Sequence, residues 1–406
     1  MAVIEGSAPP GLQLALSACQ YPGGVLDRTP RQDLDVHIDR PGPADRSSRR
    51  LRDWLLQQPG RRALIHTGDS IYIDASAGLF DPQLVADGSA ATEPGRGDAL
   101  RDALRRAYRH TRGSLYRSVT QRLQLIDDHE LIDNWEPSLD AARQQALQQR
   151  LDIGREVFIE RALLLAAPPA PIGDSALPLW GEQPIGDLRC FIADTRTERS
   201  ARDPAALAQA RIMSRAQFDA LLAWLDPLPQ ESGSTAYRRV VITPSILLPR
   251  RLASSEHPAG ALRSDAWDGY PGALHALLAA LAERPRLKGL FLSGDEHLPC
   301  VLRAEVARAD GSAAPAELLS VHTGALYAPY PFANSRPEDF SDERSFGFRA
   351  EHAGAVRDYV CRIRSCWFPL EQGDGFTTLA FGADRCADPE VVFRAADGRD
   401  YAWPGG

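Results

Sequence analysis

Lysine is almost absent from this sequence, and so are the segments that take a chain to or through a membrane. Lys288 is the only lysine, so the cations are arginines, whose forked guanidinium groups match anions well. The least polar stretches, Ala162–Gly173 and Gly269–Ala282, fall short of the roughly 18 apolar residues of a membrane span. Met1–Glu5 has neither the basic nor the apolar region of a secretory signal. The six cysteines form no CxxC motif, as is typical of reduced thiols. We therefore expect a cytoplasmic protein with no membrane partner.

The composition is that of an ordinary globular protein. Of 406 residues, 44% are hydrophobic and 25% are charged, which excludes a disordered chain, a collagen and a small disulfide-rich domain. The net charge of −8 argues against long nucleic acids as partners. We expect residues 1–406 to form a single domain with a β-rich C-terminal portion from about 362 to 406. The sequence leaves the oligomeric state open.

Short apolar runs alternate with helical patterns along most of the chain, which predicts an α/β or layered α+β fold. The clearest strands are Leu12–Cys19, Ala63–Thr67, Leu188–Ala193, Val240–Thr243, Leu287–Ser293, Leu302–Val306 and Leu318–His322, with a further strand-like run at Leu123–Ile126. The clearest helices are Asp98–Leu125, Asp140–Leu165, Arg215–Leu225 and Gly272–Glu283.

The C-terminal third has less helical pattern and more turn signals. Arg362–Phe368 and Phe376–Phe381 are predicted to pair as antiparallel strands around a glycine-containing turn, and Ala395–Arg399 predicts a second hairpin. Two long loops are surface insertions or lids, with insertion favoured: Ser76–Gly97 and Pro168–Pro178.

Polar side chains follow five of the predicted strands. In layered α/β sheets, ligands bind beyond the carboxyl ends of the strands. The residues found there are acids, a thiol, a phenol, an amide and histidines: Cys19, Asp69, Tyr72, Asp127–Glu130, Asn134, Asp194, Arg196, Asp295 and His297. One acid at a strand end is common, but five such ends predict a polyvalent polar site.

The residue types in this set point to metal. Asp295 and His297 are two apart on an extended segment, so they face the same side. One possible ligand set has thiolate and phenolate donors that suit Fe(III): Cys19, Asp69, Tyr72 and His297. A second set, Asp69, Asn134 and Asp295, has only oxygen donors and suits Ca²⁺, Mg²⁺ or Mn²⁺. Asp69 has two oxygens and can bridge both ions.

Each of these residues also has an ordinary interpretation when taken alone. Cys19 can be a small buried hydrophobe, and Gly68–Asp69 a plain turn. Asp128–Glu130 can begin a helix with solvated acids. Asp194 and Arg196 are more simply a structural ion pair, and His66 and His322 are more simply buried or supporting histidines than ligands.

Several segments, in their order along the chain, resemble those of the alkaline phosphatase D (PhoD-like phosphatase) family of calcineurin-like metallophosphoesterases. They are SACQYPGG (17–24), HTGDSIYID (66–74), RRAYRHTRGSLYRSV (105–119), LIDDHELIDNW (125–135), ADTRTER (193–199), AWDGYPGAL (266–274), LSGDEHL (292–298) and ALYAPYPFAN (325–334). The resemblance implies a four-layer α/β/β/α sandwich, a mixed Fe(III)/Ca²⁺ centre and hydrolysis of phosphate esters. It also implies the metal-ligand positions Cys19, Asp69, Tyr72, Asn134, Asp295 and His297.

The mechanism expected from such a centre needs no amino-acid nucleophile. Two cations about 3.5–4 Å apart can share a bridging hydroxide that attacks phosphorus in line. Arg109 is predicted to grip the phosphate of a small phosphorylated substrate, with Arg105 or Arg106 as rivals. His129 is predicted either to protonate the leaving group or to orient a ligand. Two alternatives stay open, namely a phosphodiesterase or nuclease acting on small nucleotides and a non-catalytic metal-binding member of the fold.

Overall fold

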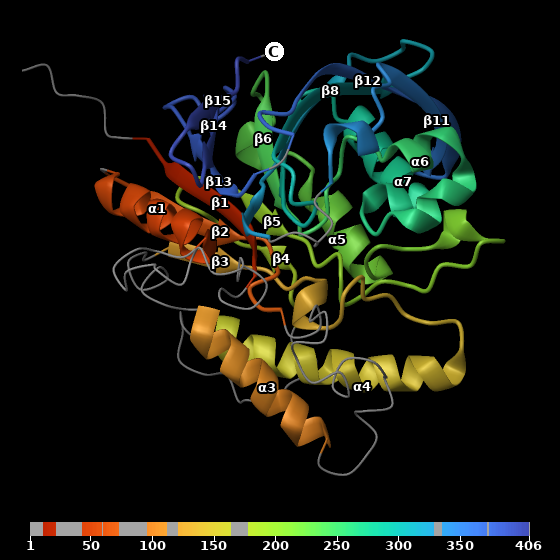
Figure 1. Ribbon diagram of the computed structural model, residues 1–406. Helices are drawn as coiled ribbons and strands as arrows, with labels where there is room; N and C mark the ends of the chain where they lie inside the picture. The colour runs from red at the N-terminus through yellow and green to blue at the C-terminus, as the bar shows by residue number, and fades with distance from the viewer. Residues whose placement is uncertain are drawn as a thin grey trace, which may run out of the picture.

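Two β-sheets stacked face to face form the centre of the computed structural model (Figure 1). The structure describes residues 11–21, 43–58, 60–72, 96–111, 121–163, 178–328, 335–371 and 373–405. The first sheet has the strand order β15-β14-β13-β1-β2-β3, and β10 pairs with the end of β1. The second has the order β11-β12-β8-β9-β7-β6-β5-β4. Strands β1, β2 and β3 run parallel, as do β5, β6, β7 and β9, so the carboxyl ends within each set lie together.

The strands of the first sheet are β1 Gln13–Gln20, β2 Arg62–His66, β3 Gln121–Gln124, β10 Ala325–Tyr327, β13 Gly375–Ala380, β14 Glu390–Ala395 and β15 Asp400–Ala402. Those of the second are β4 Gly181–Glu182, β5 Cys190–Ile192, β6 Tyr237–Ile242, β7 Leu287–Ser293, β8 Cys300–Arg308, β9 Ala316–His322, β11 Ser345–His352 and β12 Ala355–Trp367. The α-helices are α1 Pro43–Gln57, α3 Arg96–Thr111, α4 Ala141–Phe158, α5 Arg215–Trp224, α6 Leu252–Glu256 and α7 Pro271–Ala282.

Alternating side chains explain why the two sheets stack. In β1, Leu14 and Leu16 face the second sheet, whereas Ala15 between them packs against α1. In β7, Leu290 and Leu292 face the first sheet, whereas Phe291 packs towards α5 and α7. Each buried leucine contributes about 1.5–3 kcal/mol to folding. The period of two therefore gives each sheet one face for the other sheet and one face for helices.

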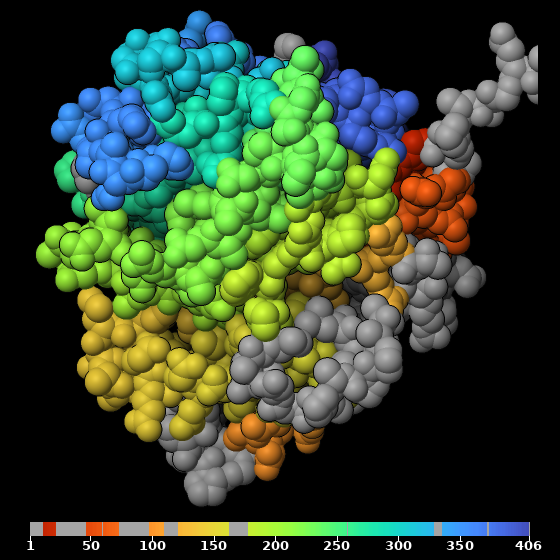
Figure 2. Space-filling model, turned by 180° about the vertical axis from the view of Figure 1, so that it is seen from behind, coloured from red at the N-terminus to blue at the C-terminus, as the bar shows by residue number. Residues whose placement is uncertain are grey.

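The resulting order of layers is helix, sheet, sheet, helix, as expected. Helix α1 covers the first sheet, and α5 and α7 cover the second. Helices α3 and α4 pack on each other and on the residues that follow β2 and β3. Figure 2 shows the molecule from behind, with the gold surface of α4 below the green surface of the residues that follow β4. Within the described ranges, no helix has both the length and the apolar composition that a membrane span requires.

The predicted strands are confirmed, with ends that differ by at most three residues, but two predictions are wrong. The helix Asp98–Leu125 does not continue to Leu125, because Gln121–Gln124 forms β3 and its backbone pairs with β2. Arg362–Phe368 and Phe376–Phe381 do not pair. The first segment belongs to β12, beside β8, and the second to β13, beside β1, in the other sheet. The two strands therefore lie in different sheets and form no hairpin.

The second C-terminal hairpin is confirmed, since β14 and β15 pair across Ala395–Arg399. Strands also occupy more of the C-terminal third than predicted, from β8 onward. Most of the loops Ser76–Gly97 and Pro168–Pro178 lies outside the described residues.

Candidate metal centre

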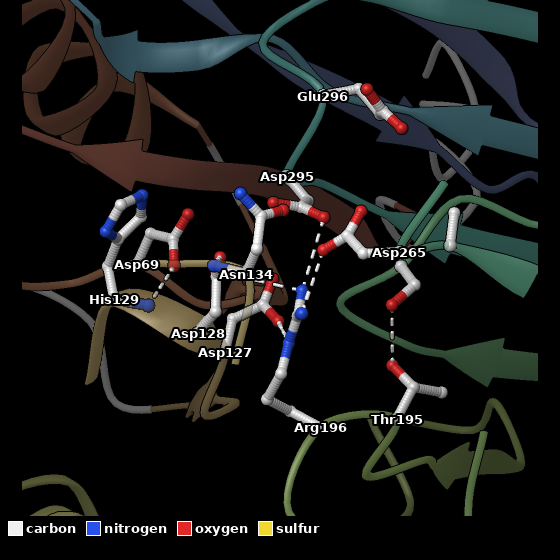
Figure 3. Close-up of polar contacts among 12 residues, drawn as sticks. Asp69, Asp127, Asp128, His129, Asn134, Thr195, Arg196, Asp265, Asp295 and Glu296 are labelled. Carbon is white, nitrogen blue, oxygen red and sulfur yellow. Dashed lines mark hydrogen bonds and ion pairs between the residues drawn. The ribbon is translucent and has the colours of Figure 1, made fainter. Parts of the chain in front are cut away.

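Strand ends from both sheets meet at one place (Figure 3). Cys19 lies near the end of β1, Asp69 follows β2, and η3 (Asp128–Glu130) follows β3. Asp295 and His297 follow β7 in the second sheet. Backbone hydrogen bonds also join the end of β1 to the loop after β2. The Cys19 N–H donates to Gly68 O at 3.1 Å and the Gln20 N–H to Asp69 O at 2.8 Å.

Two glycines let these loops approach each other. A Cβ at Gly68, whose φ is +129°, would lie 2.4 Å from the Cβ of Asp127. A Cβ at Gly294 would lie 2.3 Å from the Thr67 hydroxyl and 2.4 Å from the Cβ of Ala18. Because real side chains do not pack that closely, each Gly-Asp pair needs its glycine to bring the following aspartate into the site.

The predicted iron ligands are in mutual contact. The Cys19 thiol and the Tyr72 hydroxyl each donate to Oδ2 of Asp69 at 3.3 Å. The Tyr72 hydroxyl lies 3.4 Å from Nε2 of His297. All four side chains are buried, and donor atoms of Cys19, Asp69 and His297 lie within 4.8 Å of one another.

An oxygen-rich group shares Asp69 with this set. Carboxylate oxygens of Asp69, Asp127, Asp128 and Asp295 lie within 4.8 Å of one another. Oδ1 of Asp128 is buried and accepts no hydrogen bond within the described part of the chain. An oxygen that binds a metal ion would have this environment in the absence of the ion. The N–H of Asn134 donates to Oδ2 of Asp128 at 2.7 Å, and Figure 3 shows its amide directed towards the carboxylates.

Backbone strain is concentrated in the predicted ligands. Six non-glycine residues in the described ranges have positive φ, and five of them are Cys19 (54°), Asp69 (56°), Asn134 (51°), Asp295 (91°) and His297 (55°). Such conformations cost of order 1–3 kcal/mol each and persist where the surrounding structure imposes them, often at functional sites. The fold therefore holds these side chains at a cost that packing alone does not explain.

The family model for PhoD-like phosphatases matches residues 56–357. The chain belongs to the PhoD-like phosphatase family. It is accordingly a hydrolase of the phosphatase type. A solved structure titled "Structure of PhoD" aligns with a TM-score of 0.57 at 13% identity, covering 98% of this chain and 69% of that one, which shows the shared fold. No curated protein matches the sequence. Cys19 precedes the matched residues, so its position beside Asp69 comes from the structure itself.

Burial in this PhoD-like phosphatase disfavours the charged forms of the predicted ligands. Burial, followed by neighbouring carboxylates, raises the pKa of Cys19, Asp69 and Asp295 well above their usual values. Burial, and then the charge of Asp69, also raises the pKa of Tyr72. Anionic donors held this close need an added cation, and thiolate, phenolate, imidazole and carboxylate are donors that metals take. The residues therefore fit the metal-dependent chemistry of the family.

Glu130 and His129 support the centre from η3. Glu130 accepts the N–H groups of Asp69 at 3.0 Å, Ser70 at 2.6 Å and Asp127 at 2.9 Å, which joins the loops after β2 and β3. Burial raises the pKa of Glu130 to about 8 despite these bonds. The N–H of His129 donates to Oδ1 of Asp69 at 3.3 Å, and its ring centroid lies 4.1 Å from that of Tyr72.

The predicted phosphate-binding arginine is only partly placed. Arg109 lies on α3, which packs beside the loop after β2, but its side chain is outside the described parts of the structure. Its rival Arg105 is engaged by Glu160, at 2.8 Å. His66 and His322 are buried supporting residues, as predicted, and each bonds a serine on a neighbouring strand.

Sequence reasoning left four residues of the site unassigned, namely Asp127, Asp128, Arg196 and Asp265. The adjacent acids after β3 were a usable signal for the first two. The prediction that the side chains of Asp194 and Arg196 form an ion pair is wrong. Asp194 instead accepts the backbone N–H of Arg196 at 3.0 Å. The guanidinium of Arg196 binds Asp127 at 2.5 Å and Asp265 at 2.8 Å.

Proposed function

We propose that this PhoD-like phosphatase hydrolyses esters of small phosphorylated molecules by attack of water on phosphorus, with two cations bound at the centre. The observation that carries the proposal is the convergence of Cys19, Tyr72, Asp295 and His297, from both sheets, on the carboxylate of Asp69, with Asn134 bound beside it to Asp128. A fold that needed only a packed core would not place five of these six in strained backbone.

The donor types suggest which ions bind. Cys19, Tyr72 and His297 would hold Fe(III) together with one oxygen of Asp69. Asn134, Asp295 and Asp128 would hold Ca²⁺, or Mg²⁺ or Mn²⁺, together with the other oxygen. When bound, such ions supply a more acidic water and neutralise charge on the phosphate oxygens.

Exposure indicates how a substrate reaches the centre. The iron ligands are buried, whereas Asn134 is exposed and the side chain of Asp295 is 15% exposed. The phosphate would therefore enter over the oxygen-ligand side. Arg109 would bind it with two donors, and His129, whose Nε2 lies 3.7 Å from Asp133 Oδ1, would hold the proton for the leaving oxygen.

The test is metal analysis and hydrolysis on one sample purified without chelator. We expect iron and a second cation at one each per chain, together with hydrolysis of p-nitrophenyl phosphate, bis-p-nitrophenyl phosphate or both. The ratio of the two rates would decide between monoester and diester substrates. Metal without turnover of either compound would support the non-catalytic alternative, and protein lacking both metal and activity after reloading would refute the proposal.

A further inference from the structure

Arg196 is a fully buried cation whose donors all face carboxylates. It lies in the loop after β5, and its side chain is 0% exposed. Nε binds Asp127 at 2.5 Å, one terminal nitrogen binds Asp265 at 2.8 Å, and the other lies 3.4 Å from Asp295 and 3.7 Å from Asp128. Figure 3 shows the guanidinium standing among these four acids.

These four acids come from opposite halves of the sandwich. Asp127 and Asp128 follow β3 of the first sheet, and Asp295 follows β7 of the second, while Asp265 lies just before η8 (Trp267–Gly269). Arg196 thus links carboxylates that follow the first sheet directly to a carboxylate that follows the second.

The loop that carries Arg196 is itself fixed. The carboxylate of Asp194 accepts the N–H groups of Arg196 at 3.0 Å and Thr197 at 2.8 Å. The backbone of Asp194 is bound in turn by the Gln217 side chain, at 2.8 and 3.0 Å. Because backbone and side chain are both held, the guanidinium can serve as a fixed reference for the carboxylates around it.

We propose that Arg196 is the positioning residue of the metal centre, holding carboxylates of both sheets at the separation that a cation needs. This inference rests on the metal-dependent function proposed above. Without the guanidinium of Arg196, the four carboxylates would repel one another, and the loops that carry them would move apart. An arginine is suited to this because its charge is permanent and its donors point in three directions, whereas lysine offers a single point charge.

Substrate binding is a poorer role for this arginine. To reach a phosphate, the guanidinium would have to leave at least three carboxylates and emerge from a fully buried position. It also contacts Asp295, a proposed ligand, and Asp128, whose Oδ1 has no hydrogen-bond partner in the described ranges. Its effect on the reaction should therefore pass through the cations.

The test uses Arg196→Lys, with Arg239→Lys as the matched control. Arg239 is also 0% exposed and binds a carboxylate, Glu231 at 2.6 Å, but it lies on β6 away from the centre. Both variants lose a buried guanidinium while keeping the charge, so both should lower the melting temperature. Ca²⁺ is titrated by calorimetry into protein that has been stripped of metal and then freed of chelator. Only Arg196→Lys should weaken the Ca²⁺ affinity, by at least tenfold.

Enzyme kinetics then separate positioning from substrate binding. At saturating Ca²⁺, Arg196→Lys should recover a KM for p-nitrophenyl phosphate within about threefold of wild type. Wild-type Ca²⁺ affinity in Arg196→Lys, an equal loss in Arg239→Lys, or a raised KM at saturating Ca²⁺ would each overturn the proposal. Should Arg196→Lys not fold, Asp265→Asn frees one side of the guanidinium and should still weaken Ca²⁺ binding. The titration contains no phosphate, so wild-type protein that binds Ca²⁺ without hydrolysing esters would refute the proposed function alone.

Discussion

Replacing Asp69 by asparagine should stabilise the metal-free protein and abolish catalysis. Asp69 is 0% exposed, and burial, followed by the charge of Asp128, raises its pKa. A raised carboxyl pKa means that its contribution to stability is fully present below the unfolded pKa of about 3.9 and is lost as the pH rises through the folded value. Asparagine has nearly the same shape but does not ionise, so at pH 7 the variant avoids the loss of stability that Asp69 causes through its raised pKa.

The size of the effect can be worked from burial and chain length. Desolvating a buried polar group costs about 1–3 kcal/mol, and the Asp69 carboxylate bears this cost despite its hydrogen bonds from Cys19, Tyr72 and His129, so chelated Asp69→Asn should gain about that much. An unfolding entropy of about 2.1 cal/mol/K per residue converts the gain into a rise of about 1–4 °C in Tm. Turnover should fall by at least about a thousandfold, equivalent to about 4 kcal/mol, because both proposed ions lose a shared ligand.

The assay combines thermal melting in chelator, metal analysis and hydrolysis of p-nitrophenyl phosphate. Asp388→Asn is the control, because Asp388 binds Arg238 at 2.9 Å and Arg303 at 2.5 Å outside the centre. That variant should lose stability and keep its metals. Metal-replete Asp69→Asn with near-normal turnover, or a chelated variant that melts below chelated wild type, would refute the reasoning.

Three further outcomes are expected. Protein purified without chelator should be tinted by tyrosinate-to-Fe(III) charge transfer, and Tyr72→Phe should remove the visible band while Tyr237→Phe keeps it; a colourless wild type containing no iron would contradict the assignment. Melting of the chelated protein should shift downward between about pH 4.5 and 8, because burial raises the pKa of Asp127 to about 7 and that of Glu130 to about 8, so the folded state holds these protons more tightly than the unfolded chain and loses that advantage as the groups ionise. A rise in Tm over that range would be inconsistent with it. Arg109→Ala should keep both metals and lose about ten- to a hundredfold in kcat/KM, for a lost charged hydrogen bond of about 1.5–3 kcal/mol; unchanged kinetics would move the phosphate contact to another arginine.

The sequence predicted that the side chains after these strands would meet, because each follows a short apolar run and the carboxyl ends of parallel strands lie together. That they bind metal stays a prediction. It could not predict the pairing of β12 and β13, because a turn signal does not say in which sheet the next strand lies. It also could not predict the role of Arg196, whose partners Asp127 and Asp265 are each 69 residues away and Asp295 is 99 residues away. No periodicity relates such positions. The positive φ of Cys19 or Asp69 was equally hidden, since neither residue type requires it.

The first sheet also determines when the centre can assemble during synthesis. Its middle strand β1, which carries Cys19, pairs on one side with β13, whose residues Gly375–Ala380 are synthesised after every proposed ligand. The second-sheet ligands Asp295 and His297 emerge from the ribosome before that. Domains generally fold as units, and pairings between distant segments form slowly. A nascent chain therefore carries all six proposed ligands before β13, β14 and β15 of the seven-stranded first sheet are made. Metal loading should therefore follow the synthesis of these strands, and a product truncated before Gly375 should not retain metal.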